Sequence, residues 1–377
     1  MSTFASQPLP AWKRAVLKVG SSLLAADGGG LSPRFALGLA QFVLTSRQAG
    51  REVVIVSSGA VAAGRALLAN GKDAAATIAA KQALAALGQA QLIALWQRFF
   101  EAPVAQVLLT HDDLRNRRRY LNARSALLEL LRLGAVPVVN ENDTVAVDEL
   151  KLGDNDNLAA AVASLVDADV LLIATDIGGL YSAHPQHHPD AVPLTYIRTI
   201  TPDVLAMAGA AGALGTGGMR TKVEAADKAA MAGIATALFC GRDAATVAAL
   251  AQGVLHGSLF AAQGNRLSSR KQWLRHAPVS GTLTVDAGAQ AALLRGASLL
   301  PGGVRRVAGD FRRGDVVLVC NEAGDALAHG LAQYNAQDSA RITGQHSRDI
   351  ERVLGFRYDE AMIHRDDLVL LQQDATA

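Results

Sequence analysis

The chain has few cysteines and no long uninterrupted apolar stretch. Only two of its 377 residues are cysteine, and each of them, Cys240 and Cys320, closes a short apolar run of the kind that forms a buried strand. A disulfide framework is therefore not expected. Both thiols are interpreted as small buried hydrophobic side chains in a protein from a reducing compartment.

Signals for membrane insertion or secretion are also missing. No apolar run reaches the roughly 18 residues that a spanning helix needs. Residues 1–12 lack the basic start and apolar core of a secretion signal, and we expect them to be a disordered N-terminus. The formal net charge of only +2 argues against a protein built as a whole to bind polyanions, although a local basic patch is allowed. These absences favour a cytoplasmic enzyme without membrane contact.

What the chain does contain is apolar sequence in short segments, since half of its residues are hydrophobic. In the first two thirds, strand-like apolar runs alternate with helix-like runs, which is typical of an α/β fold with a mainly parallel sheet between helix layers. Near residue 278 the pattern changes to short strands and turns, which indicates a second, small and mostly β domain. The expected limits are 13–260 for the first domain, 261–277 for a linker, and 278–377 for the second domain with a C-terminal tail.

A polar stretch over residues 140–157 separates a buried strand-like run from a helix-like run. It contains Asn140-Glu-Asn-Asp143 and Gly153-Asp-Asn-Asp156. Open α/β sheets bind ligands at the carboxyl ends of their strands, and a helix N-terminus offers free N–H donors. A single Asp-Asn pair would indicate only a capped turn. Two such clusters so close together favour a site for a substrate and a phosphate group.

Two turns with glycine and serine follow strand-like runs nearer the N-terminus. Lys18 lies in an apolar run that ends at Gly20, and a second run ends at Ser57-Ser-Gly59. A lysine in a buried strand is costly unless it meets an anion, so Lys18 is expected to point into a phosphate site. Gly20 would let backbone N–H groups approach a phosphoryl oxygen. The alternatives are a lysine that reaches solvent and serines that only cap a helix.

A glycine-dense loop, Gly215-Thr-Gly-Gly-Met-Arg-Thr-Lys222, opens an alanine-rich helical segment. Such a loop suits a polyphosphate because its N–H groups converge at the start of a helix. It is not a Walker A sequence, since no glycine directly precedes the lysine. Taken alone, it could also be a flexible linker. No metal site is predicted, because His184, His187 and His188 lack accompanying acidic or thiol ligands.

In their order along the chain, these motifs resemble the amino acid kinase family followed by a PUA-like domain. The resemblance is carried over roughly residues 13–260 by segments 17–22, 56–64, 140–143, 153–156, 175–180 and 215–222. The PUA-like part covers about residues 278–357, where Gly302-Gly303 and Gly314-Asp315 resemble its turns. Each motif alone is weak, but all six in order are specific. The resemblance implies an amino acid kinase fold with a small, mostly β PUA-like barrel.

The resemblance further implies ATP-dependent phosphorylation of the γ-carboxylate of L-glutamate to L-glutamyl 5-phosphate. This is the first step of proline biosynthesis, with Mg²⁺ accompanying ATP and with proline as a feedback inhibitor. It implies a catalytic set of Lys18, Lys222 and Asp156, in which Asp156 orients the lysines, and glutamate contacts from Ser58, Asp143 and Asn155. It also implies ATP contacts from Lys18, Thr175, Asp176, Thr216, Gly217, Gly218, Met219, Arg220, Thr221 and Lys222.

Other functions remain open. A kinase of the same fold could act on acetylglutamate, aspartate or a nucleoside monophosphate, although the PUA-like domain and the Gly153–Asp156 motif favour glutamate. From a different class, the PUA-like domain could bind RNA through a basic cluster, whose plainer interpretation is a solvated or interdomain face. That cluster comprises Arg305, Arg306, Arg312 and Arg313. The alanine-rich helices and the arginine run at 115–119 favour a homo-oligomer, a dimer or a tetramer.

Overall fold

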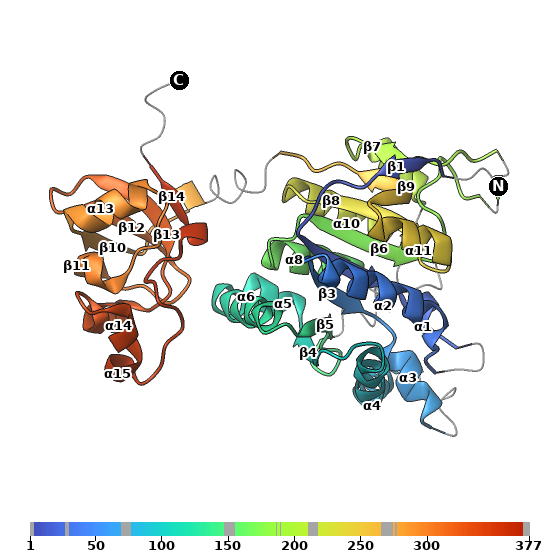
Figure 1. Cartoon of the computed structure of the whole chain (residues 1–377), viewed down its shortest axis with the longest axis horizontal. Helices are drawn as coiled ribbons and strands as arrows, with labels where there is room; N and C mark the ends of the chain where they lie inside the picture. The colour runs from blue at the N-terminus through green and yellow to red at the C-terminus, as the bar shows by residue number, and fades with distance from the viewer. Residues whose placement is uncertain are drawn as a thin grey trace. The chain divides into compact units, whose positions relative to one another are not determined.

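The protein is represented by a computed structural model that describes residues 4–26, 30–68, 77–146, 155–185, 187–188, 190–209, 218–264, 274–275 and 277–371. The chain divides into two compact units, Met1–Asn265 and Arg266–Ala377 (Figure 1). The division agrees in kind with an α/β domain followed by a smaller one. The residue limits expected for the domains and the linker stay predictions.

The first unit is built on a mainly parallel sheet with strand order β1-β9-β8-β6-β2-β3-β5-β4, and β7 pairs with β9. All neighbours from β8 to β4 are parallel, whereas β9 runs antiparallel to β8 and to β1. The strands are β1 (Ser6–Pro8), β2 (Arg14–Val19), β3 (Glu52–Ser57), β4 (Val104–Leu109), β5 (Val136–Glu141), β6 (Val170–Thr175), β7 (Tyr196–Ile197), β8 (Ala235–Cys240) and β9 (Val254–Phe260). The predicted parallel sheet is confirmed.

Helices cover both faces of this sheet, so that its central strands are buried on both sides, as their continuous apolar sequences require. On one face pack α2 (Pro33–Gln48), α3 (Ala60–Ala66), α4 (Ile78–Gln97) and α11 (Ala244–Ala251). On the other face pack α6 (Arg117–Arg132), α8 (Asn155–Leu165) and α10 (Met219–Met231). Shorter helices are α1 (Ser21–Leu24), α5 (His111–Arg115) and α9 (Pro202–Met207).

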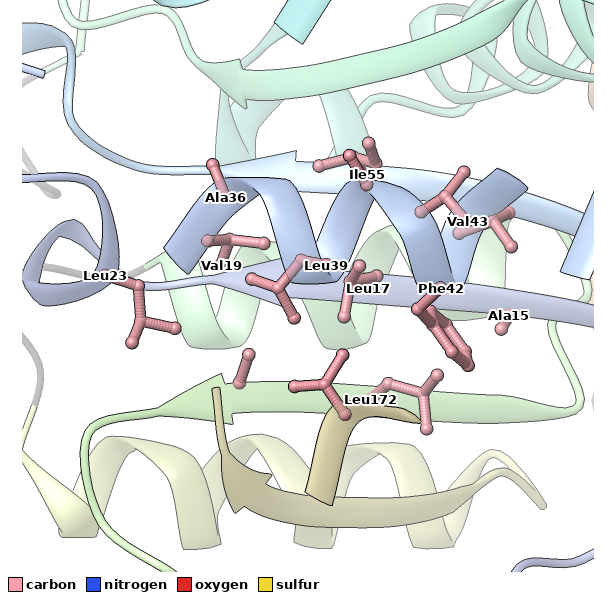
Figure 2. Packing of buried hydrophobic residues seen from close by; sticks show 14 of the residues in the cluster. Ala15, Leu17, Val19, Leu23, Ala36, Leu39, Phe42, Val43, Ile55 and Leu172 are labelled. Atoms are coloured by element: carbon pink, nitrogen blue, oxygen red, sulfur yellow. The ribbon is translucent and has the colours of Figure 1, made fainter. Parts of the chain in front are cut away.

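Alternation along β2 places its side chains on opposite faces of the sheet. Leu17 and Val19 pack with Leu39 and Phe42 of α2 in the first core (Figure 2). Because side chains alternate with a period of two, Lys18 points to the opposite face, the one covered by α8 and α10. The strand therefore directs the side chain of Lys18 into the layer that contains α8 and α10.

The N-terminal segment differs from the sequence-based expectation. Residues 6–8 form β1, which pairs antiparallel with β9, and the amide of Gln7 donates hydrogen bonds to the carbonyls of Thr195 and Gly257 at 2.7 and 2.9 Å. Trp12 is buried in the first core. The expected disorder of residues 1–12 is therefore wrong where the segment is described. A three-residue edge strand has too few side chains to show a periodic pattern.

One helix within the described ranges, α4, is long and apolar enough to be considered as a membrane span by length and composition. Its Leu92 and Trp96 lie in the first core, and it packs against α3 at Gly64 and Gly88. A Cβ atom at Gly88 would lie 1.9 Å from the carbonyl oxygen of Ala60. These contacts are those of a helix that belongs to the folded core of its unit.

The second unit is a five-stranded sheet of order β11-β10-β12-β13-β14 in which only β10 and β12 are parallel. Its core gathers around Phe311 and Tyr334, and the predicted mostly β domain is confirmed. Cys320 is buried as expected, whereas Cys240 of the first unit is only partly buried. The elements are β10 (Gly281–Val285), α13 (Ala287–Leu294), η2 (Pro301–Gly303), β11 (Val304–Gly309), β12 (Val316–Asn321), β13 (Ala326–Leu331), α14 (Ala336–Ile342), η3 (Ser347–Asp349), α15 (Ile350–Leu354), η4 (Arg365–Asp367) and β14 (Leu368–Leu370).

Candidate active site

Three charged side chains from distant parts of the chain meet where β2, α8 and α10 pack together. Asp156, in the first turn of α8, is fully buried, and its Oδ1 lies 2.7 Å from Nζ of Lys18. Its Oδ2 lies 3.1 Å from Nζ of Lys222, in the first half of α10. Both lysines are less than a tenth exposed. Buried charges are tolerated in this way only when they are paired closely.

The electrostatics of the cluster favour an ionised carboxylate. Burial alone would raise the pKa of Asp156, but the charges of Lys18 and Lys222, with hydrogen bonds from Lys18 and Thr221, outweigh it and hold the pKa at about 2. Burial lowers the pKa of Lys222, and the charge of Asp156 opposes that shift. The cluster thus contains one acidic and two basic side chains. With one more positive than negative charge, the cluster favours an anion such as a phosphoryl group.

Gly20 lies beside this cluster at the end of β2. Its backbone is extended, with φ −74° and ψ 155°, so no unusual conformation demands glycine here. A Cβ atom would instead stand 3.8 Å from Nζ of Lys18 and 3.8 Å from the carbonyl oxygen of Ala174. The absent side chain leaves space next to the lysine, which is where a phosphoryl oxygen would have to approach.

A chain of polar side chains leads away from the start of α8. Nδ2 of Asn155 donates to Oγ of Ser58 at 2.7 Å and to Oδ1 of Asn140 at 3.0 Å. Nδ2 of Asn140 donates in turn to Oε1 of Gln89 in α4 at 2.9 Å. The residues come from four separate elements or turns, and the structure therefore brings Ser58 and Asn155 together in one polar cluster that adjoins Asp156.

Asp143 follows β5 and is only 7% exposed. Burial raises its pKa from 3.8 to about 6. Within the part of the chain that the structure describes, its buried Oδ1 atom has no hydrogen-bond partner. A buried carboxylate without a partner is costly, so this group is suited to receive a cationic ligand such as an ammonium group.

Apart from the two lysines, the residues expected to contact ATP fall into three described groups and one pair that lies outside the described residues. Thr221 is oriented toward the charged cluster, because its hydroxyl donates to Oδ2 of Asp156 at 2.7 Å and to the carbonyl of Gly218 at 2.9 Å. Thr175 ends β6 and donates to Oδ1 of Asp176 at 3.2 Å, while Asp176 is partly exposed. Met219 and Arg220 lie in the first turn of α10, where Arg220 pairs with Glu224 at 2.8 Å. Thr216 and Gly217 lie outside the described residues.

Two contributions were not predicted from the sequence. Gln89 lies in an alanine- and leucine-rich segment that predicts packing or an interface, and nothing local marks it as part of a site. Trp96, from the same helix, donates from Nε1 to Oγ of Ser57 at 3.0 Å and so holds the turn that carries Ser58. A buried glutamine and a buried tryptophan on one apolar helix can be assigned to the site only once it is known which face of α4 packs toward Ser57 and Asn140.

Comparisons with known proteins identify the family. A family model described as the amino acid kinase family matches residues 13–240, and one described as the PUA domain matches residues 281–354. A glutamate 5-kinase of Xylella fastidiosa (strain M12) is 64% identical over 98% of this chain and 98% of its own length. A glutamate 5-kinase of Xanthomonas euvesicatoria pv. vesicatoria (strain 85-10) is 68% identical over 94% of this chain and 100% of its own length.

Among solved structures, a UMP kinase from Bacillus anthracis is similar with a TM-score of 0.48 and 14% identity, over 68% of this chain and 98% of that chain. The family-model matches span both units, and the curated relatives are similar over nearly the whole chain. The chain therefore belongs to the amino acid kinase family and, within it, to the glutamate 5-kinases that carry a PUA domain.

Proposed function

We propose that the chain transfers the γ-phosphoryl group of ATP to the γ-carboxylate of L-glutamate, forming L-glutamyl 5-phosphate as the first step of proline biosynthesis. The observation that carries this proposal is the buried charged cluster of Lys18, Asp156 and Lys222 beside the hydrogen-bonded pair of Ser58 and Asn155. The names of the curated relatives support glutamate as the acceptor.

The chemistry suits a site without a general base. The γ-carboxylate of glutamate is already ionised at neutral pH, so it can attack phosphorus without losing a proton. The enzyme must align the two substrates and neutralise the charge on the phosphoryl group during its transfer. Lys18 is proposed to meet the transferring group near Gly20, and Lys222 to stabilise the leaving phosphate. Asp156 holds both lysines in place through its two oxygens.

The acceptor is proposed to lie along Ser58, Asn155 and Asp143. Asp143 and Asn155 would hold the α-amino group of glutamate, since one is a buried carboxylate and the other can accept through Oδ1. Ser58 would donate to a carboxylate. Proline also presents an ammonium group and a carboxylate, and its proposed feedback inhibition would act at an overlapping site.

Mg²⁺ would enter with the nucleotide. The described residues contain no group of three His, Cys, Asp or Glu side chains that could hold a metal ion, and the Asp156 carboxylate is paired with two lysines. The proposed ligands of the ion are mainly phosphate oxygens and water, with an added carboxylate at most, and the ion would neutralise charge on the β- and γ-phosphates. The proposed nucleotide contacts are Lys18, Thr175, Asp176 and residues 216–222.

The proposal is tested by trapping the acyl phosphate with hydroxylamine. Purified protein is incubated with ATP, Mg²⁺ and hydroxylamine together with L-glutamate, L-aspartate or N-acetyl-L-glutamate, each with and without proline. Hydroxamate from glutamate alone, reduced by proline, is the expected result. Product formed only with one of the other two acids would identify that acid as the substrate in place of glutamate. The absence of product with all three acids would contradict carboxylate phosphorylation by this site.

RNA binding by the second unit is the alternative function from a different class. Of its four arginines, Arg313 is buried with its guanidinium 4.1 Å from the Tyr358 ring centroid, so the basic cluster is incomplete at the surface. Arg305, Arg306 and Arg312 are exposed, and Arg305 pairs with Asp286 at 2.9 Å. Binding of a labelled RNA by the full chain that weakens steeply with salt would support this function. Binding that is absent at low salt would exclude it.

A further inference from the structure

Gln89 is a buried carboxamide in the middle of an apolar helix. It is 7% exposed, and its Oε1 accepts a hydrogen bond of 2.9 Å from Nδ2 of Asn140 at the end of β5. Among the described residues its Nε2 atom, also buried, has no hydrogen-bond partner. Burying an amide with an incomplete set of hydrogen bonds costs stability, and such groups in native proteins call for an explanation.

The hydrogen bonds that start at Gln89 have a fixed direction. A carboxamide donates only through nitrogen and accepts only through oxygen. Because Gln89 accepts from Asn140, Asn140 must turn its Oδ1 toward Asn155, which donates to it at 3.0 Å. The same Nδ2 of Asn155 donates to Oγ of Ser58 at 2.7 Å. Reversing one carboxamide would set two donors or two acceptors against each other.

We call the hydrogen-bonded series Gln89, Asn140, Asn155 and Ser58 the relay. Its direction decides whether Ser58, at its end, donates a hydrogen bond to a ligand or accepts one. Oγ of Ser58 is an acceptor toward Asn155, so its own hydroxyl proton is what Ser58 can donate. Both amide protons of Asn155 are donated, one to Ser58 and one to Asn140. A hydroxyl donor at Ser58 matches the carboxylate of an α-amino acid.

We infer that Gln89 is a positioning residue that sets the polarity of this relay and thereby the recognition of the amino acid substrate, without touching that substrate. The inference rests on the proposed function. Gln89 acts through Asn140, and its own place is fixed because α4 is held on both sides of it. Gly88 packs against the backbone of α3, and Trp96 bonds the Ser57 hydroxyl at 3.0 Å.

The test is a comparison of Gln89→Met and Gln89→Ala with the wild type. Both variants lack the acceptor, but methionine keeps most of the volume and alanine does not. The KM for glutamate is expected to rise roughly tenfold in both, since the Asn140 amide loses its buried partner. The kcat at saturating glutamate and the KM for ATP should stay within about twofold. Gln91→Met, at an exposed glutamine of the same helix, is the matched control.

A second set of variants separates relay polarity from packing. Gln89→Glu keeps an acceptor oxygen at the same position and is expected to restore most of the glutamate affinity lost in Gln89→Met. In a Ser58→Ala background, Gln89→Met should raise the glutamate KM by no more than about twofold, because the relay no longer ends in a donor. Fully multiplicative effects of the two substitutions would overturn the inference.

The outcomes distinguish this inference from the proposed function. A wild-type protein that forms no hydroxamate with glutamate would remove the proposed function first. An active wild type whose glutamate KM is unchanged in Gln89→Met would overturn the role of Gln89 alone. A lowered melting temperature in Gln89→Met and Gln89→Ala with unchanged KM would make Gln89 a purely structural residue.

Discussion

Nζ of Lys18 lies 2.7 Å from Oδ1 of Asp156, although one residue belongs to a central strand and the other to the first turn of α8. The other oxygen of the same carboxylate is taken by Lys222 at 3.1 Å. Asp156 therefore fixes the separation of two cations that would otherwise repel each other in a buried site. Any substrate phosphate must fit the spacing that this carboxylate sets.

Asp156→Asn keeps the shape of the side chain but removes the charge that holds the lysines. We expect kcat to fall by roughly a hundredfold or more, while the KM for glutamate changes far less, because the loss falls on stabilisation of the moving phosphoryl group. Steady-state kinetics measure both constants. Asp203→Asn, at an exposed position in α9, is the control, and an unchanged kcat in Asp156→Asn would contradict the positioning role.

The same carboxylate links the cluster to stability in acid. Its pKa of about 2 in the folded chain lies below the ordinary value of 3.8, so its contribution is present above about pH 4 and is lost as the pH falls toward 2. Asp156→Asn should lose that contribution at neutral pH and show a flatter decline of melting temperature over this range. Melting curves of the two proteins at stepped pH values provide the measurement. Parallel declines would show that Asp156 adds no acid-sensitive stability.

Lys18→Met tests the other end of the pair. Methionine preserves most of the buried stem but cannot neutralise a phosphoryl group, so we expect kcat to fall by about two to three orders of magnitude. Lys13→Met is the matched control, because Lys13 precedes the same strand with an exposed side chain. Turnover by Lys18→Met equal to that of Lys13→Met would mean that Lys18 serves only to balance Asp156.

The reach of sequence-based prediction is shown by these same residues. Lys18 is predictable because a charge within an apolar strand is costly, and the period of two in β2 assigns its face. Asn155 and Asp156 are predictable from a polar motif ahead of a helix. The family resemblance and the two-domain organisation follow from the order of such local patterns, and the comparisons support both.

Gln89 and Thr221 mark where such prediction ends. The role of Gln89 depends on which face of α4 meets β5, and the helix is so uniformly apolar that its sequence does not define a face. The family resemblance implies a nucleotide contact for Thr221, but the hydrogen bond from its hydroxyl to Asp156 depends on how α10 packs against α8. Both relations are set by packing between elements far apart in the chain.

The raised pKa of Asp143 predicts that glutamate binding depends on pH. Burial raises its pKa from 3.8 to about 6, so in the ligand-free protein its ionisation lowers stability as the pH rises between those values. Only the ionised form attracts an ammonium group, and free glutamate itself has no group that titrates near pH 6. The KM for glutamate should therefore be about tenfold higher near pH 5 than on the plateau above pH 7.

The measurement is the glutamate KM at saturating MgATP across this pH range. Asp143→Asn should show a high KM that no longer varies with pH, because the titrating group is gone. A KM that stays flat from about pH 5 to pH 7 in the wild type would place the ammonium group elsewhere.

Gly88→Ala tests whether the contact between α3 and α4 supports the site. A Cβ atom there would lie 1.9 Å from the carbonyl oxygen of Ala60 and 2.3 Å from the amide nitrogen of Gly64, and these backbone atoms cannot rotate away. The helices must separate, which moves the turn at Ser58 and Gln89 relative to each other. We expect a loss of stability of about 3 kcal/mol or more and a raised KM for glutamate.

Gly38→Ala is the control, because nothing lies within 4 Å of a Cβ atom at that position of α2, and alanine there should stabilise the helix by up to about 1 kcal/mol. Equal melting temperatures for the two variants would show that α3 and α4 can adjust without cost and that their contact does not set the geometry of the site.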